Sequence, residues 1–178
     1  VYMYEHNKPN MRHSNYNKFP ATPIIGDIDT GWEAIRKTLS GQLKKSKVLV
    51  VDFYAGVYED QIADELRQMP HDVFINTRTL MKPEEEIRRM TERFITNDVI
   101  FGYITNLNLA DYFDCDKLEE ARKAIKECSN NAHIKGTGAA LLTDENSILV
   151  YADMARWEIR QRFRRHEVKA LGIDNHED

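Results

Sequence analysis

The sequence contains only two cysteines, Cys115 and Cys128, among its 178 residues. Two cysteines cannot build a disulfide framework or a cysteine cluster for zinc. We therefore expect both to be reduced thiols of a cytoplasmic protein. Long apolar runs are also missing. The longest aliphatic stretches are Val48–Val51 and Ile148–Val150, far short of the roughly 18 residues that cross a membrane. No membrane partner is expected.

An excess of positive charge is absent as well. The chain has 25 Lys and Arg residues against 29 Asp and Glu residues, which gives a formal charge of −4. General nucleic-acid binding depends on neutralising phosphates, so we expect no nucleic-acid partner. What remains is an ordinary globular mixture, 42% apolar and 30% charged. The length is typical of one domain that can bury its own core.

The amino-terminal region lacks the features of a folded segment or of a secretory signal. The first residue is Val1 rather than methionine, and residues 1–22 carry no periodic apolar pattern and no continuous apolar stretch. We expect residues 1–22 to form an extended arm and the chain to be a piece of a longer protein. Residues 23–170 are expected to form a single α/β domain, followed by a loose polar tail at 171–178.

Strand-like and helix-like segments alternate from residue 24 onward. Strands are predicted over 47–53, 72–76, 98–105, 133–142 and 147–151. Helices are predicted over 31–44, around 62–69, around 87–94, over a short stretch at 107–114, around 118–125 and over 152–168. The alternation predicts a Rossmann-like, P-loop-kinase-like three-layer sandwich with a mainly parallel five-stranded sheet.

Two features refine this predicted sheet. Val48–Val51 is apolar at every position, which is typical of a central strand buried on both faces. Only Thr143–Asn146 separates the last two predicted strands, and this gap is too short for a crossover between parallel neighbours. We therefore expect the last two strands to pair antiparallel.

Glycine is scarce in the turn where a phosphate-binding loop would be expected. The turn Asp52–Tyr58 follows the first core strand, which is where doubly wound proteins bind phosphate. It contains a single glycine, Gly56, and no nearby Lys, Ser or Thr, whereas a P-loop needs all of these. We interpret the segment as an ordinary tight turn, with Gly56 as a candidate ligand contact.

One Gly-x-Gly motif occurs, at Gly136-Thr137-Gly138, with Lys135 before it. We favour a strand bulge or a close backbone approach, because a third glycine and a downstream acid are missing. The alternative is an anion or sugar-phosphate contact through backbone amides, assisted by Lys135. Arg78, at the end of the second predicted strand, is a further candidate ligand contact, although we favour its interpretation as part of a polar strand end.

Arg156, Arg160 and Arg164 recur every four residues and would share one face of the last helix. Their mutual repulsion costs about 0.2–0.5 kcal/mol per pair unless an anion meets them. Two interpretations stay open: a solvated face, or a face that binds phosphate or an acidic partner. The six histidines show no metal-ligand spacing. No metal site and no catalytic residue are predicted.

Seven short motifs resemble a known family by their residues and their order. They are Asn17–Pro20, Gly31–Trp32, Phe53–Val57, Asn76–Arg78, Phe101–Thr105, Gly136–Ala139 and Val150–Arg160. Together they resemble the amino-terminal domain of the long, Bacteroides-type class I mannose-6-phosphate isomerases, from residue 16 onward. Tyr151–Arg160 is the most specific part.

The resemblance implies a P-loop-kinase-like fold that has lost its phosphate loop. It also implies a following cupin-type domain, which would carry the zinc and the isomerase active site. No cupin metal ligand maps onto this chain, so no cofactor is expected in it. The implied function is a non-catalytic domain of carbohydrate metabolism that is structural or binds a sugar phosphate or another anion. The alternatives are a divergent nucleoside or sugar kinase, with Arg156, Arg160 and Arg162 as phosphate clamps, and an interaction domain that docks a partner domain.

Overall fold

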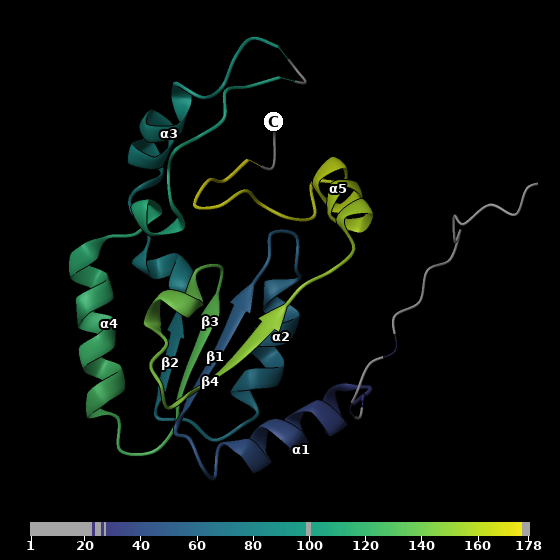
Figure 1. Cartoon of the computed structure of the whole chain (residues 1–178), viewed down its shortest axis with the longest axis vertical. Coiled ribbons are helices and arrows are strands. Elements are labelled where there is room, and N and C mark those ends of the chain that lie inside the picture. The colour runs from purple at the N-terminus through teal and green to yellow at the C-terminus, as the bar shows by residue number, and fades with distance from the viewer. Residues whose placement is uncertain (1–22, 24–25, 27, 99–100, 176–178) are drawn as a thin grey trace, which may run out of the picture.

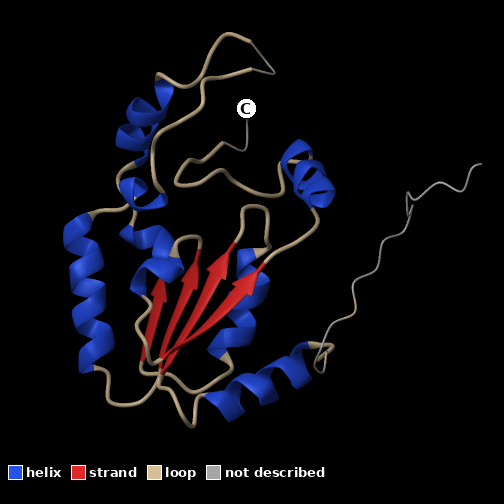
Figure 2. Ribbon diagram, viewed as in Figure 1, coloured by secondary structure: helices blue, strands red, loops and turns tan. Residues whose placement is uncertain are grey.

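A parallel β-sheet forms the centre of the molecule (Figures 1 and 2). The computed structural model describes residues 23, 26, 28–98 and 101–175. Its strands are β1 (Val48–Phe53), β2 (Val73–Asn76), β3 (Ala132–Gly136) and β4 (Ser147–Ala152). They lie in the order β2-β3-β1-β4, and every pair is parallel. The chain therefore has an α/β fold with a parallel sheet.

Helices cover both faces of this sheet. The helices are α1 (Trp32–Gln42), α2 (Glu59–Arg67), α3 (Glu84–Glu92), α4 (Cys115–Glu127) and α5 (Arg156–Arg164), with short 3-10 turns η1 (Thr77–Leu80), η2 (Leu109–Tyr112) and η3 (Ala139–Leu142). Helices α1, α2 and α4 flank the sheet, whereas α3 and α5 lie beyond the carboxyl ends of its strands (Figure 1). Leu39 of α1 and Leu66 of α2 pack in one apolar cluster. Ile87 of α3 and Leu118 of α4 pack in a second cluster on the opposite face.

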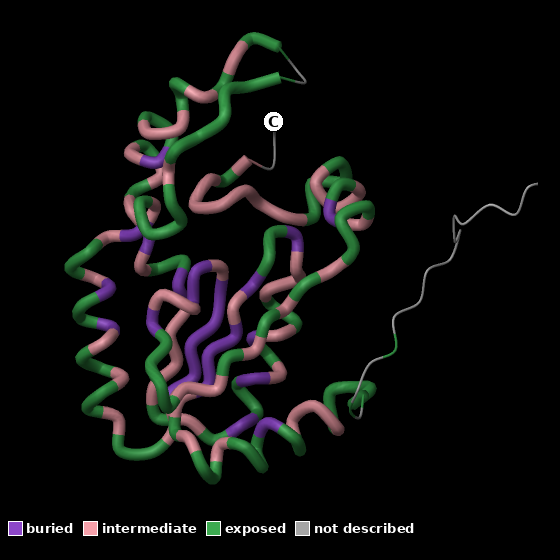
Figure 3. The backbone as a smooth tube through the Cα atoms, viewed as in Figure 1, coloured by how far each residue is buried: buried purple, intermediate pink, exposed green. Residues whose placement is uncertain are grey.

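Strand β1 is central and buried, as its sequence predicts. Leu49 and Val51 belong to the cluster of α1 and α2, whereas Val50 belongs to that of α3 and α4. Leu49 and Val50 are fully buried, as the run of buried residues along the strand in Figure 3 illustrates. A strand covered on both faces needs apolar residues at successive positions, and this explains the unbroken run.

The sheet of the described residues has four strands, so the expectation of five is wrong. The missing strand is the one predicted over 98–105. Residues 99–100 lie outside the described residues, and Phe101–Thr105 joins no ladder. Instead, the Tyr103 amide donates to the Phe94 carbonyl at 2.9 Å, beyond the end of α3. An apolar, β-prone run becomes a strand only where the fold gives it a neighbouring edge.

The last two strands are not antiparallel neighbours. Both β3 and β4 pair with β1, in parallel and on opposite sides. The prediction failed because the strand expected to reach residue 142 ends at Gly136, and residues 139–142 form η3 instead. The true connection, 137–146, carries the chain across β1.

The carboxyl-terminal region also differs from the prediction. Helix α5 is shorter than the expected 152–168, because Ala152 still belongs to β4 and the helix ends at Arg164. Leu171 and Ile173 then pack against the cluster of α3 and α4. The described part of the expected loose tail is therefore anchored by apolar contacts.

Candidate functional site

A cavity of about 710 Å³ lies at the carboxyl ends of the strands. The connection that leaves β1 carries α2 over one face of the sheet, whereas the connection that leaves β3 carries η3 over the opposite face. The two connections therefore leave the neighbouring strands β1 and β3 toward opposite faces. In open α/β sheets, ligands bind in the crevice created by such a divergence.

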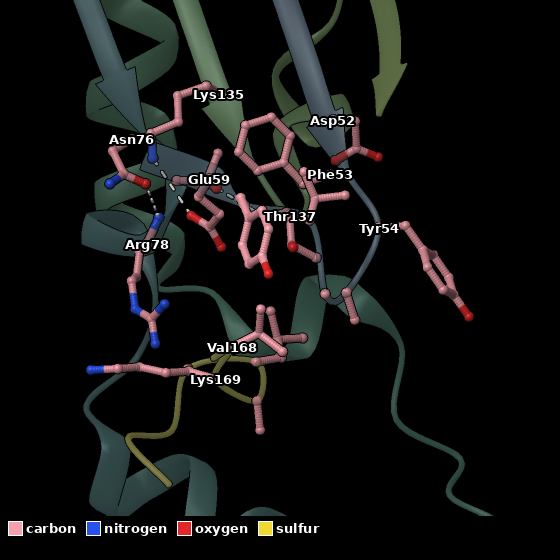
Figure 4. Close-up of a pocket in the computed structure, with 18 of the residues that line it drawn as sticks. Asp52, Phe53, Tyr54, Glu59, Asn76, Arg78, Lys135, Thr137, Val168 and Lys169 are labelled. Carbon is pink, nitrogen blue, oxygen red and sulfur yellow. Dashed lines mark hydrogen bonds and ion pairs between the residues drawn. The ribbon is translucent and has the colours of Figure 1, made fainter. Parts of the chain in front are cut away.

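Every strand contributes to the wall of this cavity. Residues 52–61 include the end of β1 and the turn after it, and Asn76–Arg78 include the end of β2. Lys135 belongs to β3, Thr137 follows it, and Tyr151 comes from β4. Residues 167–172 complete the wall, well beyond the strand ends in the chain. Figure 4 shows Val168 and Lys169 across the cavity from the strand ends.

Lys135 places a buried positive charge at the cavity. It is 2% exposed, and its ammonium lies 3.5 Å from the Glu59 carboxylate, drawn as a dashed line in Figure 4. The ammonium also lies 5.7 Å from the centroid of the Phe53 ring. A buried ammonium needs such partners, because removing an isolated charge from water costs on the order of several kcal/mol. Glu59 and Phe53 therefore hold Lys135 in place.

Asp52 presents an unpartnered oxygen at the end of β1. Its Oδ1 atom is buried and has no hydrogen-bond partner within the described chain. Asp52 pairs in register with Gly136 of β3 and Tyr151 of β4. Lost hydration, and then the carboxylates of Asp153 and Asp52, raise the pKa of Tyr151. A carboxylate oxygen left without a donor at a cavity is a candidate acceptor for a ligand.

The other side of the cavity carries positive charge. Arg78 is exposed, and its guanidinium makes no hydrogen bond or ion pair with any described residue. Its backbone amide donates to Asn76 Oδ1 at 3.1 Å. The Lys169 ammonium lies 2.8 Å from an Asp174 carboxylate oxygen. In Figure 4, Arg78 and Lys169 lie on the side of the cavity away from Asp52.

Packing accounts for the two glycines of the Gly-x-Gly motif. Thr77 Oγ1 donates to the Thr137 carbonyl at 2.9 Å. A Cβ on Gly136 would lie 2.1 Å from that same Oγ1, and a Cβ on Gly138 would lie 2.6 Å from the Phe113 ring. Neither glycine lines the cavity, whereas Lys135 and Thr137 do. Gly136 thus allows η1 to approach β3 closely.

The arginine face of α5 lies apart from this cavity. Arg156, Arg160 and Arg164 are exposed and do not line it. None of the three makes a hydrogen bond or ion pair with a described residue. The structure therefore does not bring the predicted anion-binding residues together: Lys135 and Thr137 line the cavity, and the three arginines face elsewhere.

Arg162 has a different position from its neighbours. Its guanidinium donates to the Gly56 carbonyl at 2.8 Å, pairs with Glu158 at 3.3 Å and lies 3.6 Å from the centroid of the Tyr58 ring. Only 13% of its side chain is exposed. Because these contacts occupy Arg162, it connects α5 to the turn after β1.

Glu167, a carboxylate of the cavity wall, is held ionised next to Tyr58, the residue that Arg162 contacts. Glu167 accepts a hydrogen bond from the Tyr58 hydroxyl at 2.6 Å and pairs with Arg165. Arg165, and then Tyr58, lower the pKa of Glu167 to about 2. The same pairing raises the pKa of Arg165.

Sequence reasoning missed several residues of the wall, namely Asp52, Tyr58, Glu59, Glu167 and Lys169. Asp52 carried a usable signal, because an acidic residue near the carboxyl end of a buried strand is a strong candidate in a parallel sheet. Glu167 and Lys169 carried none, since only the fold brings the region after α5 back over the strand ends.

Two negative findings apply to the residues that the structure describes. No group of three or more His, Cys, Asp or Glu side chains is placed to hold a metal ion. Among the same residues, every helix is too short or too polar to cross a membrane.

Fold and cavity together define an α/β domain with a ligand-sized crevice at the carboxyl edge of a parallel sheet. The chain belongs to a family described as a domain of unknown function, DUF8485, whose model matches residues 31–178. Searches of curated proteins and of solved structures gave no match. The family description contains no link to mannose-6-phosphate isomerases, so that resemblance stays a prediction.

Proposed function

We propose that this domain binds a small phosphorylated polyol, of the sugar-phosphate class, in the cavity at the strand ends. The proposal rests on one observation: two polar groups on opposite sides of the same cavity have no partner in the described chain. The Arg78 guanidinium lacks an acidic partner, and Asp52 Oδ1 lacks a donor, within the described chain. A ligand with an anionic end and hydroxyl groups would satisfy both.

The chemistry of each group matches one part of such a ligand. Arginine presents a planar set of donors that binds phosphate in bidentate fashion. Lys169 adds a second cation on the same side of the cavity. The Asp52 carboxylate accepts hydrogen bonds only, so it suits the hydroxyl groups of a sugar. The volume, about 710 Å³, falls in the range of roughly 300–1,000 Å³ typical of small-molecule sites.

Binding is better supported than phosphate transfer. The first turn of α2 contains Glu59 and Asp60, whose carboxylates compensate the positive end of the helix dipole where a phosphate would otherwise bind. The preceding turn has Gly56 as its single glycine. These features argue against the kinase alternative. The domain would then serve a mannose-6-phosphate isomerase-like protein as a structural or regulatory module, with zinc and catalysis in a cupin-type domain.

Isothermal titration calorimetry with mannose 6-phosphate, mannose and inorganic phosphate tests the proposal. Arg78→Ala is expected to weaken both phosphate-bearing ligands by about tenfold or more, since a charge-assisted hydrogen bond contributes about 1.5–3 kcal/mol. Asp52→Ala is expected to weaken mannose 6-phosphate and to leave inorganic phosphate unchanged.

Arg160→Ala is the matched control, because it removes an exposed, unpaired arginine that lies outside the cavity. It is expected to leave binding unchanged. The proposal is wrong if no sugar phosphate binds at millimolar concentration, or if Arg160→Ala and Arg78→Ala weaken binding equally.

A second candidate function is an interaction domain. It is favoured by the exposed, unpaired Arg156, Arg160 and Arg164 beside Trp157, which is 70% exposed. Such a face suits an acidic partner surface. If polyanions raise the melting temperature of the parent chain and of Arg78→Ala but not that of Arg160→Ala, the result would support this function instead.

A further inference from the structure

Strand β4 is an edge strand of the sheet that the described residues form, and one face of this strand is exposed. Its six residues, Ser147–Ala152, include no proline and no charge. Ile148 and Val150 pack against the cluster of α1 and α2. On the opposite face, Leu149 is 54% exposed and Tyr151 is 57% exposed. Natural edge strands are usually protected by charges, prolines or bulges, and an unprotected apolar edge favours pairing with another strand.

The backbone of this edge is available for pairing. The Tyr54 amide donates to the Ala152 carbonyl at 2.9 Å, so the backbone groups of Ala152 point toward β1. Because this direction alternates along a strand of a ladder, the groups of Leu149 and Tyr151 point outward. No backbone–backbone hydrogen bond outside the ladders, among the described residues, engages Leu149 or Tyr151.

We propose that β4 pairs antiparallel with β4 of a second copy of this chain, about a two-fold axis, to form one continuous sheet. Centring the axis on Val150 places Leu149 opposite Tyr151 of the second copy, in a pair that exchanges two backbone hydrogen bonds. The exposed apolar side chains of both copies then meet on one face. Aromatic–aliphatic cross-strand pairs of this kind stabilise antiparallel sheets.

Charge at the two ends of β4 selects the antiparallel direction and a copy of the same chain. Glu145, before the strand, and Arg156, after it, are exposed and make no ion pair with a described residue. Antiparallel pairing brings Glu145 of one copy toward Arg156 of the other, twice. Parallel pairing would bring like charges together instead. The edge is therefore complementary to itself, and this inference does not rest on the proposed sugar-phosphate site.

Analytical ultracentrifugation of the full chain, from about 1 to 200 µM, tests the proposal. A concentration-dependent dimer is expected. Leu149→Pro is expected to abolish it, because proline removes an outward amide and spares the ladder with β1; circular dichroism verifies that this variant folds. Glu145→Arg and Arg156→Glu are each expected to raise the dimer dissociation constant by about fivefold or more, and the double variant is expected to restore it.

Disulfide trapping tests the register in a Cys115→Ser, Cys128→Ser background. The Cα atoms of a hydrogen-bonded antiparallel pair lie about 5.5 Å apart, within the range of a disulfide. A mixture of Leu149→Cys and Tyr151→Cys chains is expected to form a covalent dimer faster than either chain alone. Lys123→Cys, at an exposed position of α4, measures the rate at which disulfides form between chains by random collision. A monomer at every concentration, or trapping no faster than with Lys123→Cys, overturns the proposal.

Discussion

His133 is buried in β3 without a hydrogen-bond partner for either ring nitrogen among the described residues. The ring centroid of His71 lies 5.1 Å away. Burial, and then the neighbouring His71, lower the pKa of His133 from 6.5 to about 4. The folded protein therefore keeps this imidazole neutral at a pH where the unfolded chain binds a proton.

Stability is expected to fall as the pH is lowered from 6.5 toward 4. The unfolded state binds more protons across this window, so acid favours unfolding. The pKa shift corresponds to at most about 3 kcal/mol. His133→Leu should flatten this dependence and stabilise the fold, because it removes an unsatisfied buried group. Urea unfolding at pH 7, 5.5 and 4.5 measures the effect, with exposed His166→Asn as control. If the free energy of unfolding depends on pH as steeply in His133→Leu as in the parent chain, this account is wrong.

Gly136 is the residue on which the close approach of η1 to β3 depends. Its φ is +128°, and a Cβ would lie 2.1 Å from Thr77 Oγ1. Gly136→Ala is expected to destabilise the fold by about 2 kcal/mol or more, through steric overlap and backbone strain. Gly41→Ala is the matched control, because Gly41 lies in α1 with open space around it, and alanine should stabilise a helix by about 0.5–1 kcal/mol. Thermal unfolding should show a lower melting temperature for Gly136→Ala and a higher one for Gly41→Ala than for the parent chain.

At the scale of elements, α5 depends on few contacts for its position. Ile159 is its only buried residue. The Ile159 side chain packs against Gly56 so closely that a Cβ on Gly56 would lie 3.0 Å from its nearest atom. Arg162 adds its hydrogen bond to the Gly56 carbonyl and its contact with the Tyr58 ring. The helix is therefore attached to the turn that lines the cavity.

Arg162→Met is expected to destabilise the protein by about 1–3 kcal/mol, because the Gly56 carbonyl and Glu158 lose a charged partner. Arg160→Met removes the same charge from an exposed position and should change stability by less than about 0.5 kcal/mol. Denaturant unfolding compares the two. Equal effects would show that Arg162, like Arg160, contributes only a surface charge.

At the scale of the whole molecule, three acidic side chains lie around the turn after β1, and two cations lie across the cavity from Asp52. Asp52, Glu59 and Asp60 lie at or after the end of β1, whereas Arg78 and Lys169 lie across the cavity from Asp52. A nucleotide triphosphate with magnesium would need its phosphates at the start of α2, beside Glu59 and Asp60. The charge distribution disfavours that position.

The chain is accordingly expected not to hydrolyse ATP in the presence of magnesium, with or without a nucleoside or sugar acceptor. Phosphate release measured against a buffer blank tests this expectation. Magnesium-dependent turnover that copurifies with the parent chain and disappears in Asp52→Ala would contradict it. Such a result would favour the phosphotransferase alternative.

The sequence by itself determined the layered α/β class and the place of its central strand. The run Val48–Val51 has no polar position, so it requires cover on both faces, and the structure supplies it with Leu49 and Val50 fully buried. The helix around Leu118 and Ala121 follows from spacing alone, and α4 matches it. These features depend on residues close together in the chain, which local periodicity records directly.

Only the tertiary structure decided which strands pair and which side chains meet. Phe101–Thr105 has a strand-like composition but joins no ladder, and β3 and β4, which follow each other in the chain, lie on opposite sides of β1. Asp52, Arg78 and Lys169 share a cavity although long stretches of chain separate them. Strand pairing and cavity formation depend on contacts between distant residues, and no local pattern of residue types specifies such contacts.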